Sequence, residues 1–309
     1  MTEVNPGSLK AWILAARPKT LSGALIPVML AAALAYADGC FDWVNALLCA
    51  LFACGMQIAA NFINDWWDYR KGSDGADRLG PERACAQGWI TPGAMFRGIL
   101  VTVAVSCLAF GLPVVLRSCG NMVYGGWEII AVGVASVVFA FVYTLWFSYW
   151  GLGDLLVLLF FGFVPVCGTY YVQAFTLTGD TFILSAISGV AIDALLFINN
   201  YRDRDQDFKN GKQTLIVRWG EPFGRWGYLF IGLIVTALGI WLAGRRELPE
   251  TAFFFGIVVY LALHIRTWRR LCDMRRGRQL NILLGETSRN MLLLGILLSL
   301  ALVNFGTRI

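Results

Sequence analysis

Charged residues are scarce in this chain of 309 residues: Asp, Glu, Lys and Arg make up 15% of it, against roughly 25% in a typical soluble domain. Histidine occurs once, as His264, which excludes a histidine-based metal site or catalytic triad. The eight cysteines form no CxxC pair, so we expect small buried hydrophobic residues at these positions. The net charge of +5 comes without a basic and aromatic domain of the kind that binds nucleic acid.

The chain contains long hydrophobic runs without charged residues. Hydrophobic residues make up 58% of the chain, and its mean hydropathy is +0.63. Eight runs contain no Asp, Glu, Lys or Arg, and a ninth is broken only by Asp193; they are 21–37, 43–64, 98–116, 129–153, 155–179, 226–244, 251–265, 290–307 and, with Asp193, 181–201. Most approach the roughly 20 residues that a helix needs to cross a bilayer. The sequence therefore predicts an all-α, polytopic membrane protein with about nine transmembrane helices.

Positive charge is distributed unevenly among the connections between these runs. The N-terminal segment and the second, sixth and eighth connections are rich in Lys and Arg, whereas the opposite connections and the tail carry only four cations: Arg117, Arg245, Arg246 and Arg308. The positive-inside rule then predicts a cytoplasmic N-terminus and a C-terminus outside. The basic stretch 266–278 is expected to be a solvated loop that faces lipid headgroups.

An acidic cluster follows the second run. Asn61, Asn64, Asp65 and Asp68 are spaced i, i+3, i+4 and i+7, which places them on one face of a helix. A second cluster ends the sixth run, where Asn199, Asp203 and Asp207 are spaced i, i+4 and i+8, with Asp205 on the other side. Four runs separate the clusters, so both are expected on the same side of the membrane. We therefore expect a single domain, 1–309, with two weakly repeated halves of about 11–150 and 151–309.

Clustered carboxylates and amide oxygens are ligands that suit a hard cation such as Mg²⁺. Cations close to the two clusters would attract phosphate groups; they are Lys71, Arg78, Arg83, Arg202 and Lys212. Acids and bases together indicate a metal–diphosphate site. Helix caps with solvated charges are the simpler explanation for one cluster, and a secondary transporter is an alternative for the whole chain, although transporter sites lie nearer the bilayer midplane.

At these residues the sequence resembles the UbiA superfamily of intramembrane aromatic prenyltransferases. The matching motifs are Asn64-Asp65-x-x-Asp68 with Asp74 downstream, and Asp203-x-x-x-Asp207. Further segments resemble the branch of the family that acts on 1,4-dihydroxy-2-naphthoate; they are Gly72-Ser-Asp74-x-x-Asp77-Arg78-x-Gly80-Pro81-x-Arg83, Tyr143-Thr144, Gly151-Leu152-Gly153-Asp154, Asn199-Asn200-x-Arg202-Asp203, Gly211-Lys212-x-Thr214-Leu215 and Leu283-Leu284-Gly285-Glu286-Thr287.

The resemblance implies helices around a central cavity, with the loops after the second and sixth spans as a cytoplasmic cap. It implies transfer of a polyprenyl group from polyprenyl diphosphate to 1,4-dihydroxy-2-naphthoate with loss of CO₂, in menaquinone synthesis at a bacterial inner membrane, without an obligatory protein partner or nucleic acid. Metal contacts would come from Asn64, Asp68, Asp74, Asp203 and Asp207, with Asp65 as a further catalytic residue. Substrate contacts would come from Asn61, Lys71, Asp77, Arg78, Arg83, Tyr143, Asn199, Asn200, Arg202 and Lys212. Haem or 4-hydroxybenzoate remains open as the acceptor.

The family motifs do not account for three features of the sequence. The pair Trp66-Trp67 and the intramembrane Asp193 have no assigned role. The segment Arg17-Pro18-Lys19-Thr20 resembles the family's segment ahead of the first span, but it is explained equally well as a topology signal with a proline at a helix start.

Overall fold

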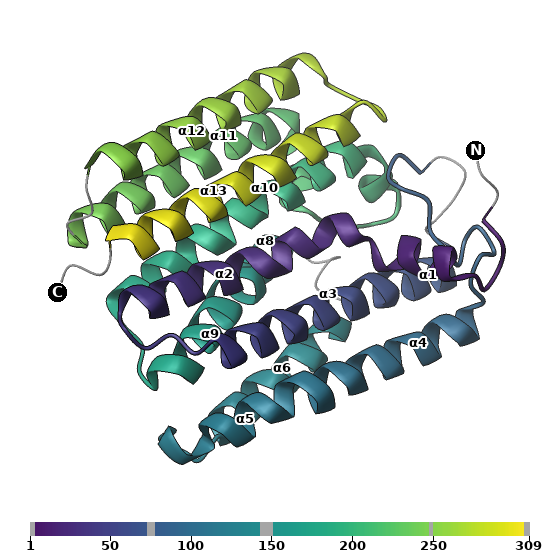
Figure 1. Cartoon of the computed structure of the whole chain (residues 1–309). Helices are drawn as coiled ribbons and strands as arrows, with labels where there is room; N and C mark the ends of the chain where they lie inside the picture. The colour runs from purple at the N-terminus through teal and green to yellow at the C-terminus, as the bar shows by residue number, and fades with distance from the viewer. Residues whose placement is uncertain (1–3, 73–77, 143–150, 247–249, 306–309) are drawn as a thin grey trace.

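The computed structural model describes residues 4–72, 78–142, 151–246 and 250–305. These ranges fold into helices joined by short connections (Figure 1). The α-helices are α1 (Leu9–Ala16), α2 (Leu21–Ala37), α3 (Trp43–Lys71), α4 (Pro92–Val105), α5 (Leu112–Ser118), α6 (Trp127–Val142), α8 (Gly153–Leu158), α9 (Val164–Ala174), α10 (Gly179–Lys209), α11 (Leu215–Arg245), α12 (Glu250–Asp273) and α13 (Leu280–Phe305). Short 3₁₀ turns η1 (Pro18–Thr20) and η3 (Cys119–Asn121) and π-helical turns η2 (Ser106–Gly111) and η5 (Leu159–Phe163) extend or join them.

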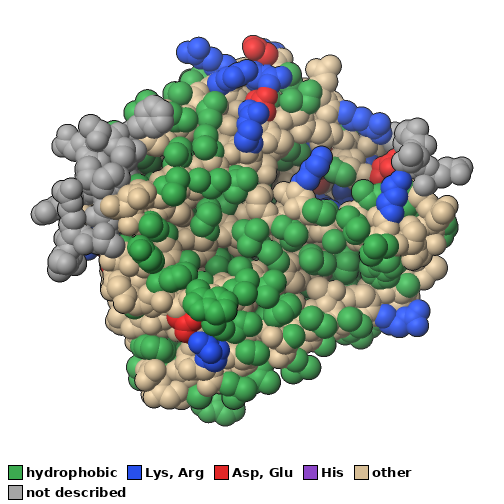
Figure 2. Space-filling model, viewed as in Figure 1, with side chains coloured by type: hydrophobic (Ala, Val, Ile, Leu, Met, Phe, Trp, Pro, Cys, Tyr) green, Lys and Arg blue, Asp and Glu red, His purple; other side chains and the backbone are tan. Residues whose placement is uncertain are grey.

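The prediction of a polytopic, all-helical membrane protein is confirmed. Among the described residues, seven helical stretches are long and apolar enough to cross a membrane, and Trp127–Val142 is a shorter apolar helix. The count of nine is therefore approximate, although each expected run falls wholly or partly on helix in the order predicted. Apolar side chains cover most of the face in Figure 2, while Lys and Arg gather mainly toward its upper and right-hand edges. Such a surface suits contact with lipid rather than water.

Helix α10 is the central element of the bundle. It packs against α2, α8, α9, α11 and α13, and Leu184, Ile187 and Ile198 on it are fully buried. Small residues bring its neighbours close: a Cβ atom at Gly162 of η5 would lie 2.5 Å from the backbone oxygen of Ser185. Close approach of this kind is how helices gain van der Waals contact where lipid supplies no hydrophobic driving force.

Local sequence signals explain where helices begin and bend. The side chains of Asp42 and Thr214 cap α3 and α11 by accepting hydrogen bonds from backbone amides of the first turn, a common use of Asp and Thr. Both π-helical turns end two residues before a proline, Pro113 or Pro165. Proline lacks the amide hydrogen that an α-helix needs and clashes with the preceding turn, so the helix widens before it.

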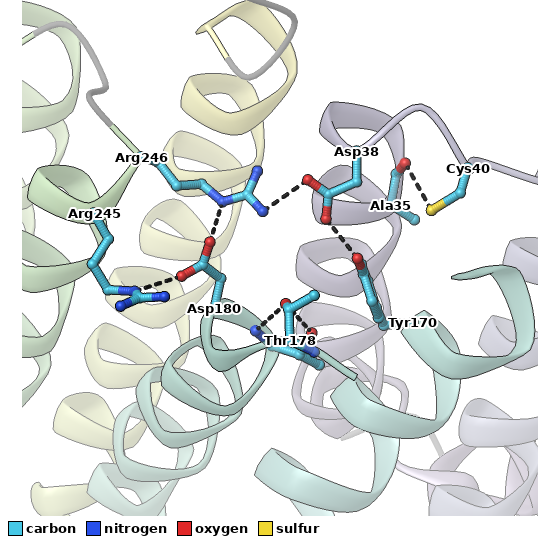
Figure 3. Close-up of polar contacts among 9 residues, drawn as sticks. Ala35, Asp38, Cys40, Tyr170, Thr178, Asp180, Arg245 and Arg246 are labelled. Carbon is cyan, nitrogen blue, oxygen red and sulfur yellow. Dashed lines mark hydrogen bonds and ion pairs between the residues drawn. The ribbon is translucent and has the colours of Figure 1, made fainter. Parts of the chain in front are cut away.

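The two ends of the bundle differ in their polar contacts. One end, here called the cap end, holds the C-termini of α3 and α10, helix α1, and the connection between α12 and α13 (Figure 1). The far end holds the C-termini of α2, α9 and α11 and the N-terminus of α10, joined by the ion pairs and the Tyr170–Asp38 hydrogen bond drawn in Figure 3.

Ion pairs neutralise the three described cations that the sequence assigns to the far end. Arg246 lies 2.8 Å from Asp38 and 2.7 Å from Asp180, and Arg245 lies 2.8 Å from the other oxygen of Asp180 (Figure 3). Arg117 pairs with Asp42 at 3.0 Å. These contacts tie α2, α10 and α11 together at the end away from the acidic clusters.

Candidate active site at the ends of α3 and α10

Asp65 anchors the segment that follows α3. Its side chain is buried, and its two carboxylate oxygens accept hydrogen bonds from the backbone amides of Ala84 and Cys85 at 2.8 and 2.9 Å. Carboxylates bonded to amides in this way form strong, charge-assisted contacts. Asp65 therefore holds the segment against α3, and its oxygens are directed to protein amides. The predicted catalytic role of Asp65 is untested, and the geometry favours positioning.

Replacing Asp65 by alanine is expected to loosen this segment. The amides of Ala84 and Cys85 would lose their acceptors, and leaving buried donors unpaired costs about 1–3 kcal/mol each. Hydrogen exchange at these two amides should accelerate by at least about tenfold. Mass-spectrometric exchange on peptides that cover residues 80–90 measures this, with peptides from α13 as the internal control. Unchanged exchange at both amides would contradict the anchoring role.

Asp68 forms an ion pair with Arg83, which lies in the segment that follows α3. Arg83 Nη2 lies 2.9 Å from Asp68 Oδ2, and the Arg83 side chain is 9% exposed. The charges of Lys212, Arg78 and Arg17 also act on the Asp68 carboxylate. Lys212 follows α10, so a cation of the second cluster acts on a carboxylate of the first.

In the second cluster, Asp203 and Asp207 each pair with a cationic side chain. Arg202 donates from Nε and Nη2 to the two oxygens of Asp203, at 2.7 and 2.6 Å. Lys212 Nζ lies 3.6 Å from Asp207 Oδ1. Arg202 is buried and its carboxylate partner is 26% exposed. Asp205 points away, as predicted, with 62% of its side chain exposed.

Three of the residues predicted to bind substrate contact other parts of the protein. Asn61 is buried and donates to the backbone oxygen of Ala16 and to Thr20 Oγ1, both at 2.9 Å. It therefore ties α3 to the segment ahead of α2, and a substrate contact for it remains a prediction. Lys71 is exposed, 5.3 Å from the Trp67 ring centroid, and Arg78 Nε donates to the backbone oxygen of Pro81 at 2.9 Å.

Three predicted substrate or metal contacts lie in the helices that carry the clusters. Asn64 on α3 and Asn199 and Asn200 on α10 are half-buried. Asp74, Asp77 and Tyr143 lie outside the described residues. Their predicted roles stay predictions.

Two residues near the clusters are not among the predicted site residues. Arg17 has a left-handed backbone, with φ of 51°, at the break between α1 and Pro18, and its charge acts on Asp68. Backbone strain at a non-glycine residue often marks a functional site. The signal in the sequence was the segment Arg17-Pro18-Lys19-Thr20, which was weighed equally as a topology signal. The second missed residue is Asn281, which had no sequence signal.

The expectation of a solvated loop over 266–278 is wrong. Residues up to Asp273 continue helix α12, and Arg270 pairs with Glu286 of α13. The backbone oxygen of Arg275 accepts a hydrogen bond from Arg204 at 2.7 Å, and Arg278 donates to the backbone oxygen of Arg78 at 3.3 Å. The basic residues here therefore join helices and approach the candidate site.

The two features left unassigned by the sequence lie outside the clusters. Trp66 packs on Phe96 of α4 with ring centroids 5.3 Å apart, and Arg70 lies 5.1 Å from the Trp66 ring centroid, an arrangement typical of membrane interfaces. Asp193 of α10 and Asp154 of α8 interact electrostatically, and each buries an Oδ1 atom without a hydrogen-bond partner in the described part of the chain.

The donor set fits a hard cation, although the described residues do not form a metal site by themselves. Across residues 4–72, 78–142, 151–246 and 250–305, no three His, Cys, Asp or Glu side chains come together as a metal-binding group. Asp68, Asp203 and Asp207 are instead each paired with Arg83, Arg202 or Lys212. Oxygen donors without histidine or thiolate suit Mg²⁺, which is commonly completed by substrate phosphates. A magnesium–diphosphate would offer these acids a metal and the cations beside them phosphate oxygens.

Comparison with protein families and curated proteins gives consistent matches. The model of the UbiA prenyltransferase family matches residues 24–284. The chain is 40% identical over 229 residues to 1,4-dihydroxy-2-naphthoate octaprenyltransferase of Escherichia coli, covering 73% of each chain. It is 32% identical over 303 residues to the Haemophilus influenzae protein of the same name, covering 96% of each chain.

Solved structures share the fold at low sequence identity. A UbiA homolog from Archaeoglobus fulgidus, bound to GPP and Mg²⁺, superposes with a TM-score of 0.66 and 12% identity, over 95% of this chain and 99% of that one. The apo structure of a UbiA homolog from Aeropyrum pernix gives a TM-score of 0.66 and 15% identity, over 92% and 97% of the two chains.

Proposed function

Because the chain belongs to the UbiA prenyltransferase family, we propose that it transfers a polyprenyl group from polyprenyl diphosphate to 1,4-dihydroxy-2-naphthoate. The products are CO₂, diphosphate and demethylmenaquinone in its reduced form, a step of menaquinone biosynthesis. The acceptor is supported by relatives of that name at 40% and 32% identity, and the donor class by the GPP-bound structural neighbour. We further propose that the reaction depends on Mg²⁺.

The observation that carries this proposal is the pairing of acids with cations at the cap end. Asp68 with Arg83, Asp203 with Arg202 and Asp207 with Lys212 provide both kinds of charge that a magnesium–diphosphate requires. A cation-transport pathway would need the acids but not the cations beside them. The pairs also keep the acids partnered before substrate binds, which avoids unpaired charge near the membrane.

The residues of the chain have separate tasks in this reaction. Asp68, Asp203 and Asp207, with Asn64 and Asp74, would hold the metal. Arg83, Arg202 and Lys212 would hold the diphosphate oxygens, with Arg78 beside them. Breaking the allylic C–O bond leaves negative charge on the diphosphate, and fixed cations stabilise that charge where it develops. Bound Mg²⁺ would add to this stabilisation as a Lewis acid.

The electron-rich ring then attacks the allylic carbon. A new C–C bond forms at the ring carbon that bears the carboxylate. The C–CO₂ bond breaks, and its electron pair restores the aromatic ring. No ring proton has to be removed for this substitution, so the protein needs to orient the ring and exclude water rather than supply a base at that carbon.

The membrane setting suits an amphiphilic donor. The apolar surface of the bundle (Figure 2) lets the polyprenyl tail stay in hydrocarbon while the diphosphate reaches the cap end. We propose that this end faces the cytoplasm of a bacterial inner membrane, with the N-terminus inside and the C-terminus outside. We also propose a single domain of two related halves, about 11–150 and 151–309, each with one acidic cluster.

Turnover of the purified protein tests this function directly. With 1,4-dihydroxy-2-naphthoate, a polyprenyl diphosphate and Mg²⁺ in proteoliposomes, we expect demethylmenaquinone to form. Chelation by EDTA should abolish product formation and added Mg²⁺ should restore it. Mass spectrometry of the extracted quinone measures the product. Product from 4-hydroxybenzoate alone would overturn the acceptor, and turnover in the presence of EDTA would overturn the metal requirement.

A further inference from the structure

Asn281, the second residue of α13, contacts helix α10 and the segment that follows α3. Its Oδ1 accepts a hydrogen bond from Arg202 Nη1 of α10 at 2.6 Å, and its Nδ2 donates to the backbone oxygen of Leu79 at 2.8 Å. Arg278, three residues earlier, donates to the backbone oxygen of Arg78 at 3.3 Å. One amide side chain therefore joins the second cluster to the segment that carries Arg78 and Arg83.

The chemistry of the two partners fixes the orientation of this amide. The guanidinium of Arg202 can only donate, and the backbone oxygen of Leu79 can only accept. Asparagine offers one acceptor and a donor group on the same short side chain. Alanine would satisfy neither partner, and aspartate would satisfy only Arg202 while adding negative charge.

Arg202 is immobilised by these contacts. Its Nε and Nη2 groups are bonded to Asp203, and its Nη1 is bonded to Asn281, with 4% of the side chain exposed. The chain also passes close by at Gly80, where a Cβ atom would lie 3.0 Å from Arg202 Nη2. A guanidinium held in one orientation before the ligand arrives binds an anion without losing further side-chain freedom.

We propose that Asn281 is a positioning residue that sets Arg202 and the 78–83 segment in the geometry that receives the diphosphate of the prenyl donor. This inference rests on the proposed function. Asn281 acts through Arg202 and Leu79 and does not itself contact the reacting atoms. Replacing Asn281 should therefore weaken the affinity for the prenyl donor much more than the affinity for the acceptor.

The test compares Asn281→Ala with wild type in the full-length protein. Calorimetric titration with geranyl diphosphate and Mg²⁺ should give a Kd about tenfold weaker for the variant, the scale expected when a hydrogen bond to a charged group is lost. The KM for the polyprenyl donor should rise by a similar factor, with the acceptor KM within about twofold of wild type. Asn281→Gln keeps the donor and the acceptor on a longer side chain and should recover binding to within about threefold.

Two further variants sharpen the comparison. Asn304→Ala is the matched control, because Asn304 lies exposed on the same helix and donates to the Leu300 backbone oxygen; it should bind the donor as wild type does. In an Arg202→Gln background, Asn281→Ala should weaken donor binding by less than about threefold, since the contact with the guanidinium is already gone and only the contact with Leu79 is left to lose.

The outcomes separate this inference from the proposed function. Wild-type donor binding by a folded Asn281→Ala protein overturns the positioning role. Equal rises in both KM values with a lowered Tm also overturn it, because they indicate a structural role alone. If wild type binds geranyl diphosphate with Mg²⁺ but does not prenylate dihydroxynaphthoate, the acceptor assignment fails while the binding comparison still decides the role of Asn281. Absence of donor binding by wild type overturns both.

Discussion

Replacing Asp203 by asparagine is expected to lower the turnover number by about 100- to 1000-fold, the loss typical when one electrostatic contact to a developing charge is removed. Asparagine keeps the shape of the side chain but removes its charge. It would weaken the proposed metal contact and lose one of the two hydrogen bonds from Arg202, at 2.7 and 2.6 Å, because the amide nitrogen of asparagine cannot accept. The initial rate of prenylated product at saturating substrates measures the effect.

Asp205 provides a matched control two residues along the same helix. Its side chain is 62% exposed, and its ion pair with Arg276 spans 3.7 Å, so Asp205→Asn should keep turnover within about twofold, as expected for a weak surface pair. Thermal unfolding of both variants checks that they are folded. Equal losses in the two variants, or wild-type turnover in Asp203→Asn, would refute the proposed role of the second cluster.

The membrane architecture could be predicted from the sequence because lipid imposes a simple rule. Charge-free stretches of about 20 residues must be helices that satisfy their own backbone groups. The even number of spans between the two clusters also predicts that they share one end of the bundle, and Lys212, which pairs with Asp207, acts electrostatically on Asp68. The bends could not be foreseen as clearly: the π-helical turns before Pro113 and Pro165 depend on how the neighbouring helices accommodate a missing amide hydrogen.

The candidate site was only partly predictable, because spacing gives a direction and not what lies in that direction. Asn61 and Asp65 share a helix face with Asp68, yet their partners are the backbone near Ala16 and the turn at Ala84. These partners arrive by tertiary folding of other segments. Asn281 lies 79 residues from Arg202 in the sequence and belongs to no motif, so only the three-dimensional contact identifies it.

Replacing Arg246 by glutamine is expected to lower the free energy of unfolding by about 3 kcal/mol, the low end of the cost of leaving a buried charge without its partner. Arg246 is 14% exposed and lies between Asp38, at the end of α2, and Asp180, at the start of α10 (Figure 3). Without it, two half-buried carboxylates would face each other with one cation fewer. Tyr170, which donates to Asp38 at 2.6 Å, and Arg245 remain as partners, so the loss stays below the upper end of that range.

The Asp38–Arg246–Asp180 ion pairs lie at the far end of the bundle, so replacing Arg246 should lower stability without lowering turnover. Arg117→Gln is the matched control, because the Arg117–Asp42 pair is 45% and 34% exposed and Asp42 keeps its bonds to the amides of Val44 and Asn45; it should cost less than about 1 kcal/mol. Unfolding by SDS titration, followed by tryptophan fluorescence, compares the two variants.

At a temperature where Arg246→Gln is folded, its turnover should stay within about twofold of wild type, since the ion pairs lie at the far end from Asp68 and Asp203. Equal stability of the two variants would mean that the Asp38–Arg246–Asp180 contacts do not hold α2, α10 and α11 together. A loss of turnover in folded Arg246→Gln would mean that the far end is coupled to the site.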